Sequence, residues 1–440
     1  MNKKQNGGKN LATKIYDSKN IKEKLYYRKM DSGLKVYYIP KEGYTKQYAI
    51  FATEYGSIDN IFTPRGETNK IEVPEGIAHF LEHKLFESPD NNIFDKFSQL
   101  GADVNAYTNF NRTAYLFSST ENFYESLGLL IDFVQSPYFT DENVEKEKGI
   151  IAQEINMYLD SPGWRVYFNC LKAMYYNHPV KIDIAGTVDS IQGITKELLY
   201  KCYNTFYNPS NMVLFVIGDL DFENIIEVVD KHENKSKTEV EEIHRFFPEE
   251  PKIIKEKLVE ENMLISTPVF YIGFKDLDVN LTGEKLVKSD LITDMILDIL
   301  FGTSSKFYND LYEEGLIDSS FGAVYTGDKT YGHSLIVGES KEPKTVYNKV
   351  LELIKRPVED LFTEADFERI KRKTMGDFLM GLNSVEFVGN NFIDLYFSDF
   401  MIVDYLDLLE NIRYEDIIDR FNSHLKEDNV VLSIIKPLEK

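Results

Sequence analysis

Cysteine and long apolar runs are both scarce in this sequence, and each absence excludes a class of protein. The two cysteines, Cys170 and Cys202, form no C-x-x-C pair, so no disulfide framework is indicated, and we expect both to be small buried residues. No apolar run approaches the roughly 20 residues that a membrane-spanning helix needs. The basic first residues lack the apolar core of a secretory signal. We therefore expect a cytoplasmic protein that does not enter a membrane.

Positive charge is also in short supply. Lysine and arginine total 50 against 72 aspartates and glutamates, which gives a net charge of −22. A protein that binds nucleic acid needs a basic face that displaces counterions from phosphates. We therefore expect no nucleic-acid partner.

The length and the local composition predict two domains. The 440 residues exceed the roughly 250–300 over which a single core grows. The Lys/Asn/Gly-rich residues 1–20 are expected to form a flexible tail. The charged stretch that includes "TEVEEIHRFFPEEP" has few aliphatic residues and predicts a solvated linker, which we place at residues 233–258. The domains then span residues 21–232 and 259–440.

The apolar pattern mixes strands with helices. Aromatic and β-branched residues predict strands at 34–40 and 47–58, a hairpin over 101–120 and a buried strand at 211–220. Helical spacing predicts helices at 74–87, 122–137 and 140–160, the last with Thr140 as its N-cap. This mixture is typical of the α+β class.

The two halves of the chain carry related segments. "FTDENVEKEKG" begins at Phe139 and "FTEADFERIKRK" begins at Phe362, an offset of 362 − 139 = 223 residues. A helix, a Phe-Thr turn and an acidic second helix recur together, and the period is far too long for a solenoid. We infer a duplicated domain whose two copies share a fold.

Two of the seven histidines lie four residues apart in "GIAHFLEHKLFE", residues 76–87. On a helix, His79 and His83 point to one side with Cβ atoms roughly 5–6 Å apart, and both could reach one zinc ion at about 2.0–2.1 Å. Glu82 lies near the same face and could act on a water molecule beside the metal. The alternative is a pair of solvated histidines on an ordinary helix.

A catalytic zinc ion usually has a third protein ligand, and the segment "VEKEKGIIAQEINMY" offers the best candidates. Glu147 and Glu154 are seven residues apart, so they share a helix face with only about 20° of drift. Two carboxylates in register opposite a histidine pair suggest one ligand and one supporting carboxylate. At the offset of 223, Glu147 falls on Ile370 and Glu154 on Asp377, and the second half contains no His-x-x-Glu-His.

His-x-x-Glu-His is the signature of the inverted zincins. The chain resembles the peptidase family that includes pitrilysin, insulin-degrading enzyme and mitochondrial processing peptidase, and most of all a short bacterial subgroup of zinc peptidases. The resemblance covers nearly the whole chain and includes "NAYTNFNRTAYLF", "HPVKIDIAGT", "YNPSNMVLFVIGD" and "FGTSSKFYNDLYEEGL".

The resemblance implies a zinc endopeptidase that hydrolyses peptides or unfolded segments through a metal-activated water. It implies His79, His83 and Glu154 as the zinc ligands and Glu82 as the general base. Glu147 is implied as the carboxylate that supports a ligand from behind.

The same resemblance implies a fold and a place for the substrate. Two homologous domains, each a mostly antiparallel sheet covered by helices, are expected to form half of a clamshell. Substrate peptides are expected to lie along an edge strand at Asn105, Ala106 and Tyr107.

One stretch departs from the family pattern. Family members usually carry an arginine and a tyrosine in the second domain, in a pattern like L-R-E-x-x-G-L-x-Y, and these stabilise the oxyanion of the tetrahedral intermediate. In "LYEEGLIDSS", Tyr312 stands at the arginine position, and Asp318 or Ser319 stands at the tyrosine position. The resemblance therefore leaves the oxyanion donors of this chain unassigned.

Two explanations of the departure are open, and they predict different assemblies. Lys306 with Tyr308 or Tyr325 could replace the pair, or a homologous partner subunit that lacks the zinc motif supplies an Arg/Tyr pair. We expect the second, and with it a heterodimer in which this chain is the catalytic subunit. The alternative function is a non-catalytic structural subunit of a peptidase-like complex, although such subunits normally lose the histidines or Glu82.

The other histidines have no partners at metal spacing. His178 precedes a proline in a loop and is expected to be structural. Surface positions are expected for His232, His244, His333 and His424.

Overall fold

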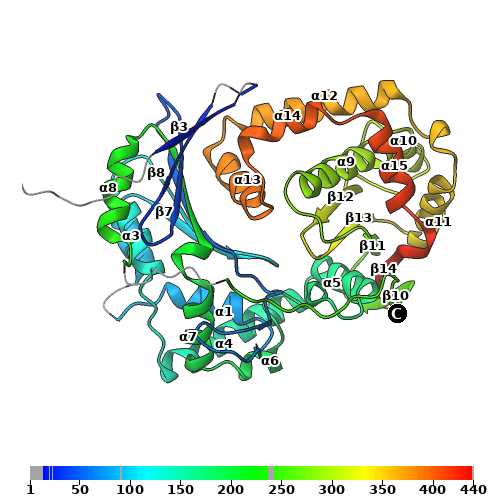
Figure 1. Cartoon of the computed structure of the whole chain (residues 1–440). Helices are drawn as coiled ribbons and strands as arrows, with labels where there is room; N and C mark the ends of the chain where they lie inside the picture. Colours follow the sequence, from blue (N-terminus) through cyan, green and yellow to red (C-terminus); the bar gives the residue numbers. More distant parts are fainter. Residues whose placement is uncertain (1–12, 19, 22, 90–91, 236–241, 439–440) are drawn as a thin grey trace, which may run out of the picture.

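Two separate β-sheets organise the chain, one in each half, in the computed structural model (Figure 1). The structure describes residues 13–438 apart from 19, 22, 90–91 and 236–241, so most of the expected tail and part of the expected linker lie outside the described residues. The first sheet contains, in spatial order, β1 (Lys14–Asp17), β2 (Lys24–Lys29), β3 (Lys35–Pro40), β9 (Met212–Gly218), β4 (Gln47–Thr53), β8 (Thr113–Ser119) and β7 (Asp103–Thr108). The second contains β10 (Leu258–Met263), β14 (Val430–Pro437), β11 (Val269–Lys275), β13 (Gly332–Glu339) and β12 (Gly322–Gly327).

Both sheets are mostly antiparallel. Each has one parallel pair, β3 with β9 in the first sheet and β10 with β14 in the second. A short ribbon of β5 (Ile61–Phe62) and β6 (Ile71–Glu72) stands apart from both. The predicted α+β class with two similar sheets is confirmed.

Helices cover both sheets (Figure 1). Those of the first half are α1 (Ile77–Leu85), α2 (Ile93–Gln99), α3 (Phe123–Val134), α4 (Asp141–Leu159), α5 (Pro162–Met174), α6 (Val188–Gln192), α7 (Lys196–Phe206) and α8 (Phe222–His232). Those of the second half are α9 (Glu284–Phe301), α10 (Lys306–Glu313), α11 (Pro343–Ile354), α12 (Glu364–Gly381), α13 (Val385–Phe397), α14 (Tyr405–Glu410) and α15 (Tyr414–His424). Within the described residues, no helix combines the length and apolar character needed to cross a membrane.

The repeat seen in the sequence recurs in the helix pairs that follow each Phe-Thr turn. Thr140 caps α4 by accepting a hydrogen bond from the Asn143 amide at 3.1 Å, and Thr363 caps α12 in the same way on Asp366 at 3.3 Å. Adding 223 to the bounds of α5 gives 162 + 223 = 385 and 174 + 223 = 397, which are the bounds of α13. The duplication therefore extends over two consecutive helices.

The second helix of each pair crosses to the other half. α5 belongs to the first half of the chain but packs on β10, β11 and β14, whereas α13 from the second half packs on β4 and β9. Both contacts are close enough to require a small residue. A Cβ at Gly389 of α13 would lie 2.4 Å from the Tyr48 ring, and a Cβ at Gly273 of β11 would lie 2.4 Å from Met174 of α5. Each half therefore covers a sheet of the other.

Part of the expected tail forms a strand. Residues 14–17, which fall within it, are β1 in the structure. The backbone of β1 pairs with β2 in a register that runs from Lys14 opposite Tyr27 to Asp17 opposite Lys24. All four side chains are exposed, so backbone hydrogen bonds rather than an apolar pattern hold the strand, and composition gave no sign of it.

The expected linker is anchored where it meets the junction of the two halves. The Glu250 carboxylate accepts hydrogen bonds from the backbone amides of Tyr176, Asn177 and His178 at 2.7–2.9 Å. The buried Lys275 ammonium donates to the same carboxylate at 2.5 Å. Glu250, which the sequence predicts to be solvated, therefore accepts hydrogen bonds from four donors. The bounds of the two domains remain a prediction.

Two histidines expected at the surface are buried. His333 lies 3.1 Å from the Tyr175 hydroxyl, and His424 lies 2.7 Å from the Ser334 hydroxyl. Burial lowers the pKa of each imidazole to about 3, so both are neutral. His178 is buried and accepts from the Val180 amide at 3.1 Å, as expected of a structural residue. The prediction for the cysteines is also confirmed, because both are free and buried.

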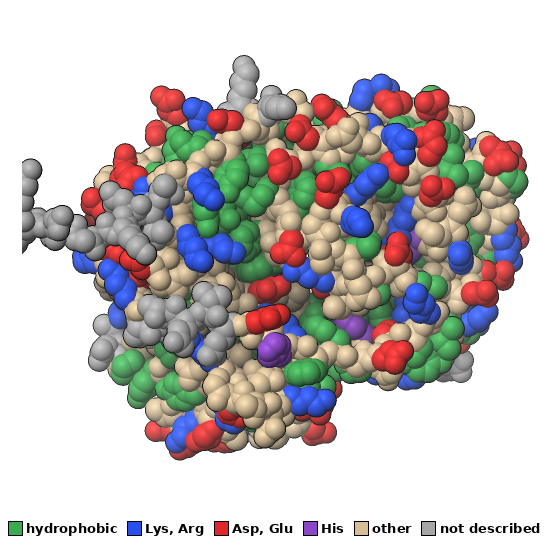
Figure 2. Space-filling view, viewed as in Figure 1, with side chains coloured by type: hydrophobic (Ala, Val, Ile, Leu, Met, Phe, Trp, Pro, Cys, Tyr) green, Lys and Arg blue, Asp and Glu red, His purple; other side chains and the backbone are tan. Residues whose placement is uncertain are grey.

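Charge is distributed rather than gathered on the visible face of the molecule. In Figure 2, lysines and arginines are interspersed with aspartates and glutamates over both halves. Acidic residues outnumber basic ones in the sequence, and residues of both signs are spread over that face.

Because α13 packs closely on the first sheet, we expect Gly389→Ala to destabilise the protein, although Gly→Ala in a helix usually stabilises it. Alanine usually favours a helix over glycine by about 1 kcal/mol, but here the added Cβ would overlap the Tyr48 ring, which is buried. We expect a net loss of about 1–3 kcal/mol in the free energy of unfolding, because α13 must shift from the sheet. Urea unfolding followed by circular dichroism measures the change.

Gly376→Ala in α12 is the matched control. A Cβ at Gly376 meets open space, so this variant is expected to gain roughly 0.5–1 kcal/mol. Equal shifts of the two midpoints in one direction would contradict the close packing of α13 on β4.

Candidate metal centre

Helix α1 carries the histidine pair and is fixed at its start by a glycine. Gly76 has a φ of +86°, and a Cβ there would lie 2.2 Å from the Ala185 carbonyl oxygen, so the position requires glycine. The helix begins at Ile77, three residues after the predicted start at residue 74. The apolar face of α1 is buried and consists of Ile77, Phe80, Leu81 and Leu85. This burial fixes the rotation of the helix and hence the direction of its polar residues.

The two histidines lie side by side and face the predicted glutamates of α4. Their ring centroids are 4.5 Å apart. His79 Nε2 lies 3.7 Å from Glu154 Oε1, and His83 Nε2 lies 3.6 Å from Glu154 Oε2. One ligand atom from each of the three residues lies within 4.8 Å of the others. The structure therefore brings together the three residues that the sequence singled out as ligands.

Glu147 occupies a different place from Glu154. Its carboxylate is buried and lies 3.1 Å from His83 Nδ1, the ring nitrogen on the far side from Glu154. Because a carboxylate accepts, Nδ1 carries the proton, and the lone pair of His83 Nε2 is directed to the space shared with His79 and Glu154. The two carboxylates thus take different places, as the sequence suggested. Glu154 lies beside Nε2 of both imidazoles, and Glu147 lies at Nδ1 of His83.

The pKa values of the two imidazoles shift in opposite directions because their partners differ. Burial, with a smaller effect of His83, lowers the pKa of His79 to about 3, so this ring is neutral. Burial also acts against the charged form of His83, but the bond to Glu147 and the charges of Glu82 and Glu154 outweigh it and raise the pKa of His83. Nδ1 of His79 is buried and has no hydrogen-bond partner among the described residues.

Lys84 is a member of the site that the sequence analysis missed. Its side chain is fully buried, and its Nζ lies 3.8 Å from Glu147 Oε2, donates to Glu87 at 2.5 Å and donates to the Asn143 carbonyl at 3.2 Å. A buried ammonium requires such partners. The spacing of Lys84 and Glu87 is the only local signal, and it is common on helices.

Glu82 lies next to the histidines and is held by the neighbouring strand. The side chain is buried, and the Thr108 hydroxyl donates to its Oε2 at 3.0 Å. Burial raises the pKa of Glu82, while the charge of His83 and the Thr108 bond act in the opposite direction. Thr108 is a second residue that the sequence analysis did not single out.

Thr108 ends β7, the strand on which substrate was expected to lie. β7 is the last strand in the order of the first sheet, and α1 packs beside it. Asn105 is exposed, and its side chain accepts from the Ala106 amide at 2.9 Å, while Tyr107 is half-buried. An edge strand with an amide that bonds outside the ladder can accept a further strand.

The stretch that departs from the family pattern lies in the second half. Tyr312 on α10 is exposed and stacks on Tyr308, with ring centroids 6.0 Å apart. Asp318 accepts from the Ser320 amide at 2.8 Å, and the exposed Lys306 donates to Asp310 at 2.7 Å. The Tyr325 hydroxyl donates to the buried Asp276 at 2.7 Å. Each of these side chains thus has its recorded contacts within the second half.

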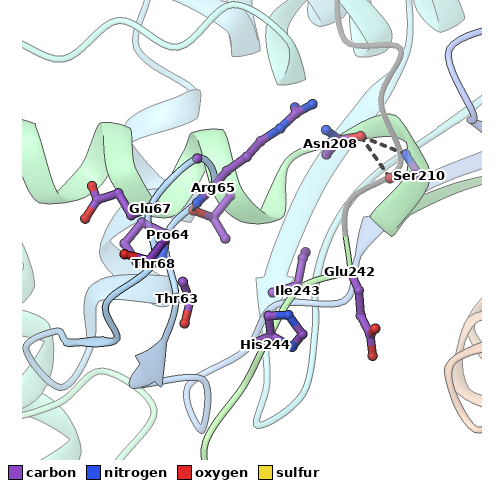
Figure 3. Close-up of a pocket in the computed structure, with 12 residues that line it drawn as sticks. Thr63, Pro64, Arg65, Glu67, Thr68, Asn208, Ser210, Glu242, Ile243 and His244 are labelled. Atoms are coloured by element: carbon purple, nitrogen blue, oxygen red, sulfur yellow. Dashed lines mark hydrogen bonds between the residues drawn. The ribbon is translucent and has the colours of Figure 1, made fainter.

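One well-defined hollow in the first half is separate from the histidines. A cavity of about 450 Å³ lies between the loop of residues 63–68 and the segments around Asn208 and His244 (Figure 3). Its lining contains none of the residues of the metal cluster. The His79, His83 and Glu154 cluster therefore lies outside this cavity, beside the edge strand β7.

Two family models match the chain one after the other. The model described as insulinase, peptidase family M16, matches residues 65–188, and the model described as the peptidase M16 inactive domain matches residues 193–374. The first match contains every residue of the metal cluster, and the second begins after it.

Relatives and solved structures agree with these matches. An uncharacterized zinc protease of Bacillus subtilis strain 168, YmfH, is 45% identical over 425 residues, which cover 96% of this chain and 99% of that protein. Zinc protease PqqE of Helicobacter pylori is 25% identical and covers 93% of this chain and 92% of its own. The crystal structure of an M16-like peptidase from Alicyclobacillus acidocaldarius superposes with a TM-score of 0.87 at 39% identity, covering 98% of this chain and 99% of that chain. The chain belongs to peptidase family M16.

Proposed function

We propose that this chain is a zinc-dependent endopeptidase whose metal is held by His79, His83 and Glu154. The carrying observation is that two imidazole nitrogens and one carboxylate oxygen converge within 4.8 Å beside the buried Glu82. Two imidazoles and a carboxylate are a donor set that suits catalytic zinc, which keeps a position open for water or substrate. The neutral state of His79 leaves its lone pair available for a metal.

The residues around the ligands divide the work of peptide hydrolysis. Zinc bound there would supply Lewis-acid activation of a water molecule and of the scissile carbonyl. Glu82 acts as the general base that takes the proton of the attacking water and returns it to the leaving amine. Thr108 holds one oxygen of that carboxylate. Extended peptide pairs with β7 through main-chain hydrogen bonds at Asn105, Ala106 and Tyr107, which selects shape more than sequence.

Glu147 and Lys84 support the ligand His83 from behind. The bond from His83 Nδ1 to Glu147 fixes the tautomer and the orientation of the ring. Lys84 in turn holds Glu147 in its charged form, because the ammonium, like the His83 bond, lowers the pKa of that carboxyl against the effect of burial.

We further propose that the active form is a heterodimer. No arginine stands in "LYEEGLIDSS", and the contacts of Tyr308, Tyr312 and Tyr325 lie within the second half. A homologous subunit that lacks the zinc motif would supply an Arg/Tyr pair to the oxyanion. The competing possibility, a structural subunit without activity, predicts that the metal binds and no peptide is cleaved by any mixture.

Glu82→Gln is expected to keep zinc and lose hydrolysis. The amide cannot accept the water proton, and general-base catalysis is worth about 10²–10⁴ in rate. Cleavage of a quenched fluorescent peptide measures the rate, and metal analysis of the purified variant measures zinc. Equal rates of wild type and Glu82→Gln would refute the proposed role.

Glu147→Gln is expected to weaken zinc binding by about 10–100-fold, because His83 loses the partner that orients it. The single tryptophan offers a readout, since Trp164 stacks on Tyr158 at 4.6 Å, one helical turn beyond Glu154 on α4. Zinc titration followed by tryptophan fluorescence gives the affinity.

Glu145→Gln is the matched control for this variant. Glu145 lies on the same helix, is 68% exposed and pairs with Lys148. The zinc affinity of Glu145→Gln should equal that of the wild type. An equal loss of affinity in Glu145→Gln and Glu147→Gln would argue against a specific role for Glu147.

The heterodimer predicts that the isolated chain is slow. Losing an oxyanion donor costs about 10²–10³ in rate, so mixing with the homologous subunit should raise cleavage by that factor. Replacing the arginine of the subunit with alanine should abolish the gain while the two chains still co-elute. If the isolated chain cleaves peptide as fast as the mixture, it supplies its own oxyanion donors, and the heterodimer proposal is wrong.

A further inference from the structure

The turn between β7 and β8, residues 109–112, lies at the junction of the two halves. The Asn109 side chain closes the turn by accepting from the amides of Asn111 at 3.1 Å and Arg112 at 3.0 Å. On the side of the first half, the amides of Ser57 and Ile58 donate to the carbonyls of Asn109 and Phe110 at 2.9 and 3.0 Å. The Asn109 side chain therefore closes the turn, and the backbone of Ser57 and Ile58 binds it to the first half.

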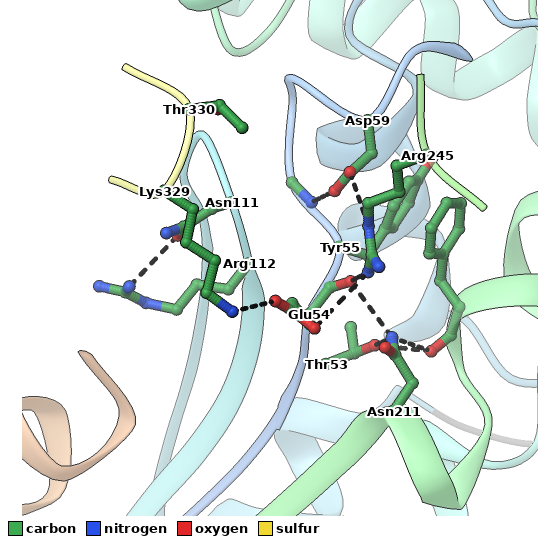
Figure 4. Close-up of polar contacts among 12 residues, drawn as sticks. Thr53, Glu54, Tyr55, Asp59, Asn111, Arg112, Asn211, Arg245, Lys329 and Thr330 are labelled. Carbon is green, nitrogen blue, oxygen red and sulfur yellow. Dashed lines mark hydrogen bonds and ion pairs between the residues drawn. The ribbon is translucent and has the colours of Figure 1, made fainter. Parts of the chain in front are cut away.

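The second half holds the other side of the same turn. The side-chain amide of Asn111 donates to Asp328 at 2.5 Å, Arg112 forms an ion pair with Asp394, and the Phe110 ring lies 5.9 Å from that of Tyr331. Asn111 and Arg112 lie on the hairpin close to Lys329, which reaches across to Glu54 at 3.3 Å (Figure 4). Phe110 is buried, so this contact is part of the interior.

The strand that leads into this turn, β7, ends at Thr108, the residue that holds Glu82. The Thr108 hydroxyl donates to Glu82 at 3.0 Å and lies 3.2 Å from the Thr113 hydroxyl across the hairpin. Thr113 in turn donates to the Tyr55 carbonyl at 2.9 Å. Contacts therefore run without a break from Asp328 in the second half, through the turn, to the carboxylate beside the histidines.

We propose that Thr108 is a positioning residue for Glu82, and that the second half sets the place of Thr108 by holding the β7–β8 turn through Asn111. This inference rests on the proposed function and adds a role for the second half within one chain. The Thr108 bond fixes Oε2 of Glu82 and so aims Oε1 at the reacting water. Without that bond the carboxylate can rotate, and fewer of its orientations accept the proton.

Thr108→Val keeps the size of the side chain and removes the donor. We expect kcat to fall about ten- to a hundredfold, the effect of a hydrogen bond to a charged group. KM and zinc affinity should stay within about twofold. Thr108→Ser restores the hydroxyl and should recover most of kcat. Assays use the full chain, with its partner subunit if the mixture is the active form.

Thr345→Val is the matched control, because the Thr345 hydroxyl donates to Glu342 at 2.9 Å on the surface of the second half. It removes the same kind of bond and should leave kcat unchanged. Asn111→Ala should lower kcat of the wild type, yet have little further effect in Thr108→Val, because both act through Glu82. Wild-type kcat in Thr108→Val, or fully additive losses in the double variant, would overturn the proposal.

Hydrogen exchange separates this proposal from the proposed function. Asn111→Ala should speed exchange of the amides in β7 and α1, whether or not any peptide is cleaved. Unchanged exchange in both elements would overturn the coupling. If exchange speeds up while wild type and Glu82→Gln hydrolyse peptide equally, the coupling stands and the proposed function fails.

Discussion

The reciprocal exchange of α5 and α13 between the two sheets is the constraint on which the rest of the structure depends. A sheet must bury its apolar face, and here each sheet completes that burial with a helix of the other half. The rings of Phe215 and Phe392 stack at 4.2 Å in the contact of α13 with the first sheet. Separating the halves would expose both sheets at once. At this junction, both halves contact the β7–β8 turn.

At the metal cluster, the balance between burial and pairing decides the charge of each group. Burial, with a smaller effect of His83, lowers the pKa of His79 enough to keep the ring neutral, whereas three carboxylates near His83 outweigh the effect of burial there. Glu147 and Glu82 are both buried, yet the pKa of Glu147 is lowered and that of Glu82 is raised. The difference is the Lys84 ammonium and the bonded imidazole at Glu147. A carboxyl with a raised pKa beside a metal cluster is suited to carry a proton.

Much of the fold and of the cluster could be predicted from the sequence, because both rest on local spacing. The spacing of four positions between the histidines and of seven between the glutamates places each pair on one helix face, and the offset of 223 predicts where helices recur. The predictions that were wrong concern residues whose partners are distant in sequence. The sequence predicts a solvated Glu250, but its carboxylate accepts hydrogen bonds from three backbone amides of residues 176–178. It also predicts an exposed His424, but this ring is buried and lies against the Ser334 hydroxyl.

The duplicated half offers an internal comparison for the buried charges of the first. At the offset of 223, Glu147 corresponds to Ile370, which is buried in α12, and Glu154 corresponds to Asp377, which is 53% exposed and pairs with Lys373. The same helix thus folds in the second half with an apolar residue at the position of Glu147. Burying a charged pair such as Lys84 and Glu147 costs desolvation that an apolar residue avoids, so such a pair is weak support for stability. Since the fold does not require these charges, their presence in the first half supports a chemical role for them.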